Sequence, residues 1–280
     1  MWAARAANAA KNATAAALSA LLCTACGGGI PLMHPARTLP RGEVRGAAGV
    51  SAQAPVGTLA SDLQNARNDA AATGSAQPLP GDVQYAKGAL IAAAVAPGLA
   101  PYVSARVGVG WTSEGGIAYT GRAARIDMRK SFDLSESSSV SIGAGLTVPF
   151  YGRQGEEALP NVDLSALHGY GFDVPLLIGW ESSGGIYKLW GGVRGGYEYD
   201  AISNVSTEPK AVPLGFQPIS LSANRVYGAG VVGMAVGFRH LHVALELDAS
   251  YQSISGTFNA TDVKVAGVSL APASAIWWQF

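Results

Sequence analysis

Residues 138–151, SSVSIGAGLTVPFY, alternate between two kinds of side chain. From Val140 to Phe150 every second residue is apolar, and the residues between them are serine, glycine or threonine as far as Thr147. A period of two puts these two sets on opposite faces of a β-strand. The run exceeds the roughly 5–6 residues of an ordinary strand and reaches the roughly 9–11 that a tilted strand needs to cross a bilayer. It therefore predicts a two-faced strand of membrane-spanning length.

Segments of this kind recur along the chain from residue 43. We predict ten strands, at 43–54, 82–95, 100–112, 116–130, 138–151, 169–181, 185–200, 221–238, 242–257 and 263–280. The first two are the weakest, because 55–81 reads as an irregular or helical insert and 82–95 is rich in alanine. A wall of eight strands is the alternative, if those two segments do not belong to it.

The connections between the predicted strands favour an even count. With both termini periplasmic, the outward connections are 55–81, 113–115, 152–168, 201–220 and 258–262, and three of them are long. The inward connections are 96–99, 131–137, 182–184 and 239–241, all of them short. Long outer loops and short periplasmic turns are typical of bacterial outer-membrane barrels. Since an open sheet edge in hydrocarbon costs several kcal/mol per unpaired backbone group, the strands must close on themselves. We therefore predict an all-β fold, an antiparallel up-and-down transmembrane β-barrel over 43–280.

The last residues of the chain carry the most specific signal. They read AIWWQF over 275–280, with Ile276, Trp278 and Phe280 on one face of the final strand. This ending resembles the β-signal of outer-membrane β-barrel proteins, which their assembly machinery reads. The resemblance implies a bacterial outer-membrane location, with outer-membrane lipids and the barrel-assembly machinery as partners.

The first residues read as a targeting segment. Residues 1–25 combine two basic residues with an apolar stretch too short to span a membrane, which indicates a signal peptide. Cys26 follows small residues, as in the lipobox of bacterial lipoproteins, and is a candidate for lipidation, although Cys23 stands where leucine is usual. Cleavage by an ordinary signal peptidase after Ala25 is the alternative. Residues 26–42, rich in glycine and proline, are interpreted as a flexible tether.

Composition excludes several kinds of protein. Lys+Arg and Asp+Glu are 19 each, so no basic excess suggests nucleic-acid binding. The two cysteines lie before residue 27, so no disulfide and no cysteine metal site is expected in the mature chain. The four histidines have no zinc-like spacing. We expect no metal, no cofactor and a monomer.

The inward face of the predicted strands carries charges of both signs. These are Arg106, Arg125, Asp127, Arg129, Lys188, Arg194, Glu198, Glu246 and Asp248. Buried charges must be paired or solvated, so they form either an ion-pair network that fills the lumen or the lining of a narrow pore. Arg122 has the opposite parity, which requires a bulge near Gly121 or a place for Arg122 at the membrane interface.

The predicted function is an outer-membrane barrel with a structural role, or a narrow passive pore for small polar solutes. The alternative is a surface interaction or adhesion protein that uses loops 152–168 and 201–220, whose partner the mixed charge of these loops does not indicate. Asp163, Ser165 and His168 share one loop without the rigid support that nucleophilic catalysis needs. We therefore predict no catalytic residues and no enzyme activity.

Overall fold

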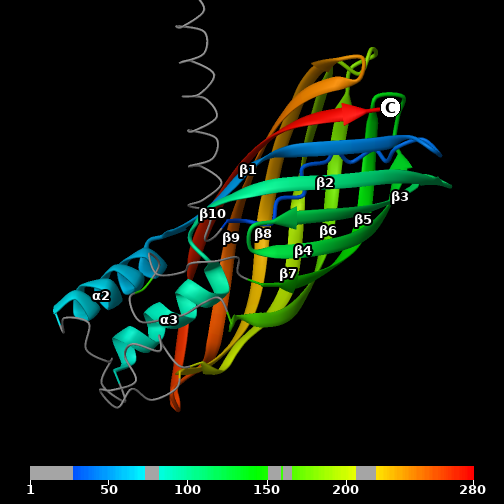
Figure 1. The fold of residues 1–280 in the computed structure, drawn as a ribbon. Helices are drawn as coiled ribbons and strands as arrows, with labels where there is room; N and C mark the ends of the chain where they lie inside the picture. Colours follow the sequence, from blue (N-terminus) through cyan, green and yellow to red (C-terminus); the bar gives the residue numbers. More distant parts are fainter. Residues whose placement is uncertain (1–27, 73–81, 151–158, 160–165, 206–218) are drawn as a thin grey trace, which may run out of the picture.

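The computed structural model describes residues 28–72, 82–150, 159, 166–205 and 219–280. Within them the chain forms two helices and a closed barrel of ten strands, each paired antiparallel with its neighbours in sequence (Figure 1). The strands are β1 (Val44–Val56), β2 (Gly98–Gly110), β3 (Ser113–Thr120), β4 (Ala123–Asp133), β5 (Ser138–Pro149), β6 (His168–Glu181), β7 (Tyr187–Val205), β8 (Ile219–Phe238), β9 (Leu241–Phe258) and β10 (Thr261–Gln279). The helices are α2 (Thr58–Ala72) and α3 (Val83–Val95).

The predicted ten-stranded antiparallel barrel is confirmed, and the eight-stranded alternative is wrong. The number of strands is correct because two errors in the predicted strands cancel: one predicted strand is a helix, and another is two strands. The predicted strand 82–95 is helix α3, whose first turn is capped by the Asp82 carboxylate through the N–H groups of Gln84 and Tyr85 at 2.9 and 3.1 Å. The predicted strand 116–130 is instead a hairpin of β3 and β4.

Because of these two errors, two predicted connections were also assigned to the wrong end of the barrel. The short turn after β2 lies at the barrel end that holds Val44 and Phe280, so the prediction of 113–115 as an outward connection is wrong. For the same reason 96–99 is not an inward turn: Ala96 and Pro97 end the long connection between β1 and β2, and Gly98 and Leu99 begin β2. We call the barrel end that holds Val44 and Phe280 the terminus face. The opposite end, where the connections β1–β2, β5–β6 and β7–β8 lie, is the loop face.

The outer surface of the barrel is mainly apolar. On β6 the residues from Tyr170 to Trp180 that point outward are all apolar or aromatic, and each is at least 41 % exposed. Exposed aromatic side chains gather near both rims, including Trp111, Trp180, Phe238 and Trp278 at the terminus face and Tyr119, Tyr170 and Phe172 at the loop face. Ten residues of strand at about 3.3 Å each, tilted about 40°, separate Tyr170 from Trp180 by about 25 Å along the axis, the height of the apolar band of outer-membrane barrels.

Leu176 lies midway between these aromatic rims and points outward. Leu176→Arg is expected to lower the free energy of unfolding by about 2–4 kcal/mol, because it buries a cation at the bilayer midplane. The matched change at the rim, Leu134→Arg, is expected to cost about 0–1 kcal/mol. Urea unfolding in lipid vesicles checks the difference, and equal costs for the two variants would mean that the band does not contact lipid.

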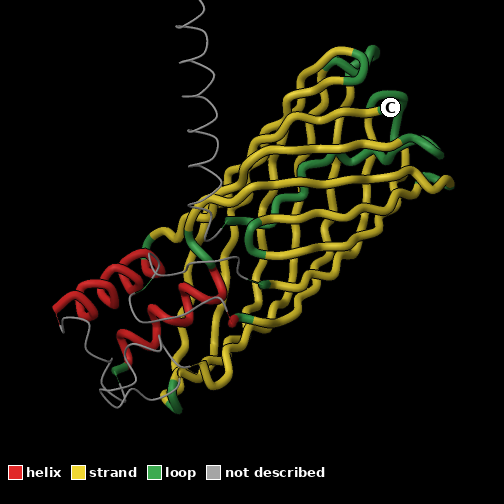
Figure 2. The backbone as a smooth tube through the Cα atoms, viewed as in Figure 1, coloured by secondary structure: helices red, strands yellow, loops and turns green. Residues whose placement is uncertain are grey.

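Beyond the apolar band, only part of the barrel wall continues at the loop face. Strands β7 to β10 have 18–20 residues, whereas β2 to β6 have 8–14, so the longer strands extend past the rest at the loop face (Figure 1). There the inner face of β9 changes from polar, at Ser250 and Gln252, to apolar, at Ile254 and Phe258. Helices α2 and α3 pack against this apolar part, as Figure 2 shows.

Helix α3 is apolar on all sides from Gly88 onward and buried along most of its length. Its small side chains let α2 approach closely: a Cβ on Gly88 would lie 2.2 Å from that of Ala66. Tyr85 packs on Phe258 with ring centroids 5.5 Å apart, and burial raises the pKa of its phenol. The described part of the chain holds no helix long and apolar enough to cross a membrane. The two helices lie against the inner face of the extended strands at the loop face.

Candidate functional site

Residues 28–39 lie inside the barrel, where Figure 2 shows a loop trace between the strands, and the exposed residues 40–42 lead into β1. Leu32, Met33, Ala36 and Leu39 are all at most 3 % exposed. The prediction of a flexible tether is therefore wrong for these residues, whereas Cys26 and the predicted signal peptide 1–25 lie outside the described residues. Glycine and proline resemble a linker, but the apolar side chains between them are buried against the lumen wall. We call residues 28–42 the lumen plug.

Buried carboxylates of the wall bind the N–H groups of the lumen plug. Glu246 accepts the main-chain N–H groups of Leu32 and Met33 at 2.6 and 2.8 Å, and also the indole N–H of Trp190 at 2.8 Å. Nearer the terminus face, Glu114 accepts the N–H of Leu39 at 2.8 Å. These carboxylates take the place of a neighbouring strand for a segment that has none.

Arginine side chains of the wall bind the carbonyl groups of the lumen plug. Arg129 donates to the carbonyls of Pro35 and Ala36, and to that of Arg37 at 3.2 Å. Arg194 donates to the carbonyl of Ile30 at 2.6 Å. Because these partners are main-chain atoms, the wall recognises an extended polypeptide more than a particular set of side chains.

The lumen plug is fixed at both of its ends. At one end the N–H of Gly28 donates to the Ala96 carbonyl at 3.0 Å. At the other the N–H of Gly42 donates to the Gly108 carbonyl at 2.9 Å. Only glycine fits at position 108, since a Cβ there would lie 2.0 Å from the carbonyl oxygen of Pro40. The plug is therefore part of the packed structure.

All nine predicted lumen charges lie on the inner face of the wall, with side chains at most 9 % exposed where ion pairs are described. Near the terminus face, Arg106 pairs with Glu114 and with Asp127. Arg125 bridges Asp127 and Asp173, the latter at 3.0 Å. Arg194 continues the chain of pairs to Asp173 at 3.0 Å and Asp248 at 3.9 Å. Lys188 lies 3.5 Å from Glu181.

Sequence reasoning missed several partners in this network. They are Glu114, Asp173, Asp200 and Arg225. Asp173 could have been found, because it alternates with the apolar outward residues of β6. The nine predicted lumen charges therefore included more cations than anions.

A second charged cluster lies beneath helix α3. Arg122 and Arg225 both pair with the carboxylate of Glu198, and both also donate to the Ala94 carbonyl in the last turn of α3. Cations are favoured at a helix C-terminus, where unpaired carbonyls carry partial negative charge. The predictions of a bulge near Gly121 or an interfacial Arg122 are both wrong. Arg122 lies in the turn between β3 and β4, which turns its side chain into the lumen.

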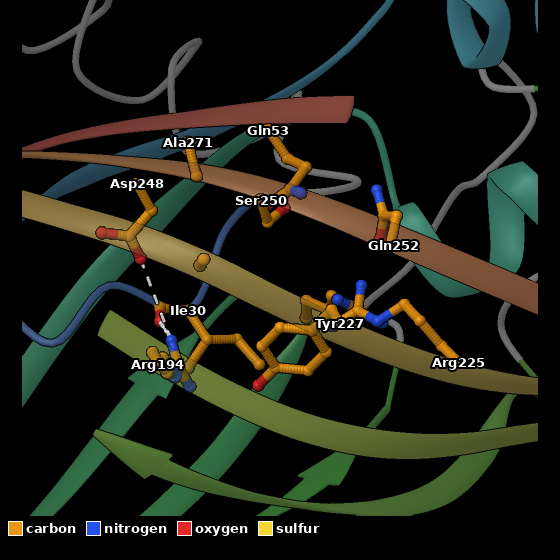
Figure 3. Close-up of a pocket in the computed structure, with 11 residues that line it drawn as sticks. Ile30, Gln53, Arg194, Arg225, Tyr227, Asp248, Ser250, Gln252 and Ala271 are labelled. Atoms are coloured by element: carbon orange, nitrogen blue, oxygen red, sulfur yellow. Dashed lines mark hydrogen bonds and ion pairs between the residues drawn. The ribbon is translucent and has the colours of Figure 1, made fainter. Parts of the chain in front are cut away.

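A small pocket remains between the lumen plug and the cluster beneath α3. Its volume is about 40 Å³, and its lining includes Ile30 of the plug together with Arg194, Arg225, Asp248 and Gln252 (Figure 3). At about 10–15 Å³ per water, it holds a few water molecules. No group of three or more potential metal ligands is found among the described residues.

Comparisons with known proteins give low similarities. No family model and no curated protein matches this chain. Ail, the attachment invasion locus protein of Yersinia pestis solved with a heparin analogue, is 9% identical over 86% of this chain and 99% of its own, with a TM-score of 0.31. The copper transporter OprC is 11% identical over 80% of this chain and 30% of its own, with a TM-score of 0.33. A major outer membrane protein from Thermus thermophilus is 13% identical over 64% of this chain and 98% of its own, with a TM-score of 0.29. Because these similarities are so low, the roles of these proteins are not assigned to this chain.

The decisive observations are the closed antiparallel wall and the apolar band between two aromatic rims. This chain folds as a membrane-spanning β-barrel of the outer-membrane type. In the barrel the predicted assembly residues Ile276, Trp278 and Phe280 face outward and are 53–64 % exposed. Trp277 between them points inward and stacks on Trp190, with ring centroids 5.6 Å apart. Their reading by an assembly machinery stays a prediction.

The structure does not test two further predictions, the absence of enzyme activity and the use of two loops for interaction. His168 begins β6 at the loop face and is exposed, with its ring Nδ1 3.3 Å from the Ala166 carbonyl oxygen. Asp163 and Ser165 lie outside the described residues, as do most of the predicted interaction loops 152–168 and 201–220. Absence of enzyme activity therefore remains an expectation.

Proposed function

We propose that this protein is a plugged outer-membrane channel. It is closed in the described state and passes small polar solutes when the lumen plug leaves. The observation that carries the proposal is the burial of residues 28–39 of the lumen plug, which wall side chains hold through its main chain. A purely structural barrel of this size can fill its lumen with side chains of the wall itself.

The dimensions of the wall support this proposal. Ten strands about 4.8 Å apart and tilted about 40° enclose a cylinder with a backbone radius of about 10 Å. With the lumen plug gone, the lining is polar and carries both signs of charge, from Arg129 near the terminus face to Arg194 and Asp248 nearer the loop face. Such a lining favours small hydrated solutes without strong selection by charge. The proposal requires no cofactor, no catalysis and no second copy of the chain.

Deleting residues 29–41 tests the proposal by conductance in planar bilayers. The full chain is expected to give no unitary current, and the deletion variant to give discrete steps, because the polar lumen is opened. A matched control replaces 206–218 with a glycine–serine loop, which changes as many residues at the loop face but leaves the lumen plug in place. Assembly of each variant is checked by the mobility of unheated against boiled samples.

Either of two outcomes contradicts the proposal: steady current through the full chain, or silence of an assembled deletion variant. Silence would favour the second candidate, surface interaction. That candidate is supported by helices α2 and α3 and the extended strands β7 to β10, which form a rigid base for the loops. Loss of cell-surface binding on deletion of either predicted loop would then distinguish it.

A further inference from the structure

The two ends of the barrel wall meet at one face. Val44 N–H donates to the Phe280 carbonyl at 2.7 Å, and Phe280 N–H donates back to Val44 at 3.0 Å. An even number of antiparallel strands requires this, since each strand reverses the direction of the last. A barrel of this kind ordinarily leaves both chain ends on the same side of the membrane.

The lumen plug departs from this arrangement because it runs the length of the barrel. Its contacts follow the barrel axis in order. Leu39 binds Glu114 at the start of β3, and Thr38 binds Ser131 near the end of β4, both close to the terminus face. Leu32 and Met33 bind Glu246, further along the lumen on β9.

The other end of the lumen plug reaches the loop face. Gly29 N–H donates to the Ala52 carbonyl at 3.3 Å, and its carbonyl accepts the Ser51 hydroxyl at 3.0 Å. Ser51 is paired with Ala100, which lies beyond the last pair of β2 and β3, Tyr102 with Thr120. Gly28 is bonded to Ala96, which precedes β2 in the loop-face connection.

From these contacts we infer that the chain crosses the membrane once more, through its own barrel. Gly28 then lies at the loop face, and the polypeptide that precedes it enters from that face, opposite the C-terminus. Residues 28–42 are long enough: at up to about 3.3 Å per residue they can span more than the apolar band of about 25 Å. The predicted lipidation of Cys26 would anchor the protein in the leaflet of the loop face, because two residues reach about 7 Å.

Epitope tags at three places test this topology in cells. One tag is inserted between Gly27 and Gly28, one within 206–218 at the loop face, and one in the turn 134–137 at the terminus face. We expect an impermeant antibody to give the first two tags the same accessibility on intact cells, and the third the opposite. The proposal is overturned if the first tag follows the one in 134–137.

A disulfide provides a second measurement, in case the tag blocks assembly. A Cβ on Gly29 would lie 2.6 Å from that of Ala271, so G29C and A271C are placed to cross-link after a small shift. A protease site in 206–218 then cuts the chain, and the two fragments should stay joined on a non-reducing gel. G29C with Gln279→Cys, at the terminus face, should leave them separate, and the reverse result excludes the proposed path. The topology stands even if the conductance test fails, since a threaded segment need not control passage.

Discussion

Glu246→Leu is expected to lower the free energy of unfolding by about 3–5 kcal/mol and to loosen the lumen plug. The variant removes the acceptor of three buried donors: the N–H groups of Leu32 and Met33 and the indole of Trp190. A buried donor left without a partner costs about 1–3 kcal/mol. The midpoint of urea unfolding in lipid vesicles, followed by tryptophan fluorescence, measures the loss.

Two matched variants separate this effect from a general loss of charge. Glu246→Gln keeps one carbonyl oxygen as an acceptor, so we expect it to lose less than Glu246→Leu. Asp262→Leu removes a carboxylate from an exposed position on β10 and is expected to change stability by at most about 0.5 kcal/mol. An equal shift in Glu246→Leu and Asp262→Leu would contradict the role of Glu246 in holding the plug.

Glu198→Leu is the second change with a large expected effect. It leaves Arg122 and Arg225 buried beside each other, with the Ala94 carbonyl as a shared acceptor and Asp200, 3.8 Å from Arg122, as the remaining carboxylate. Removing one member of a buried ion cluster costs about 3–5 kcal/mol, because it leaves an excess of buried charge of one sign. Helix α3 should loosen as well, which hydrogen exchange of its amides measures.

A double-mutant cycle tests whether this cost comes from the ion cluster. Arg225→Leu alone is expected to be milder than Glu198→Leu, since Arg122 still pairs with Glu198. The double variant Arg225→Leu with Glu198→Leu should lose less than the sum of the two single losses, by about 0.5–3 kcal/mol. Strict additivity would show that the arginines and Glu198 do not act together.

Alternation was a reliable guide to the wall because each strand faces lipid on one side and the lumen on the other. It failed for helix α3, which is apolar on every side from Gly88 onward and so has no periodicity there to distinguish it from a buried strand. It also joined β3 and β4 into one strand, although the inward positions change from even-numbered residues in β3 to odd-numbered residues in β4. The parity of Arg122 was the available signal of the turn between them.

The lumen plug could not be predicted from its own residues. Its partners Glu114, Arg129 and Glu246 come from three strands, and they bind main-chain atoms that every sequence has. Nine of the inward charges, by contrast, were predicted from strand parity alone. Their pairing required the register of neighbouring strands, which the hydrophobic pattern of one strand does not contain.

The position of the plug directly before β1 bears on the order in which the molecule forms. β1 pairs with β10 from Arg45 with Gln279 to Val56 with Val268, and this ladder is the seam at which the first and last strands meet. If the seam forms last, the wall folds around residues 28–42 and no finished cylinder has to be threaded. We therefore expect β1 and β10 to pair only after the amino-terminal segment lies across the open sheet, because this order avoids threading a closed barrel.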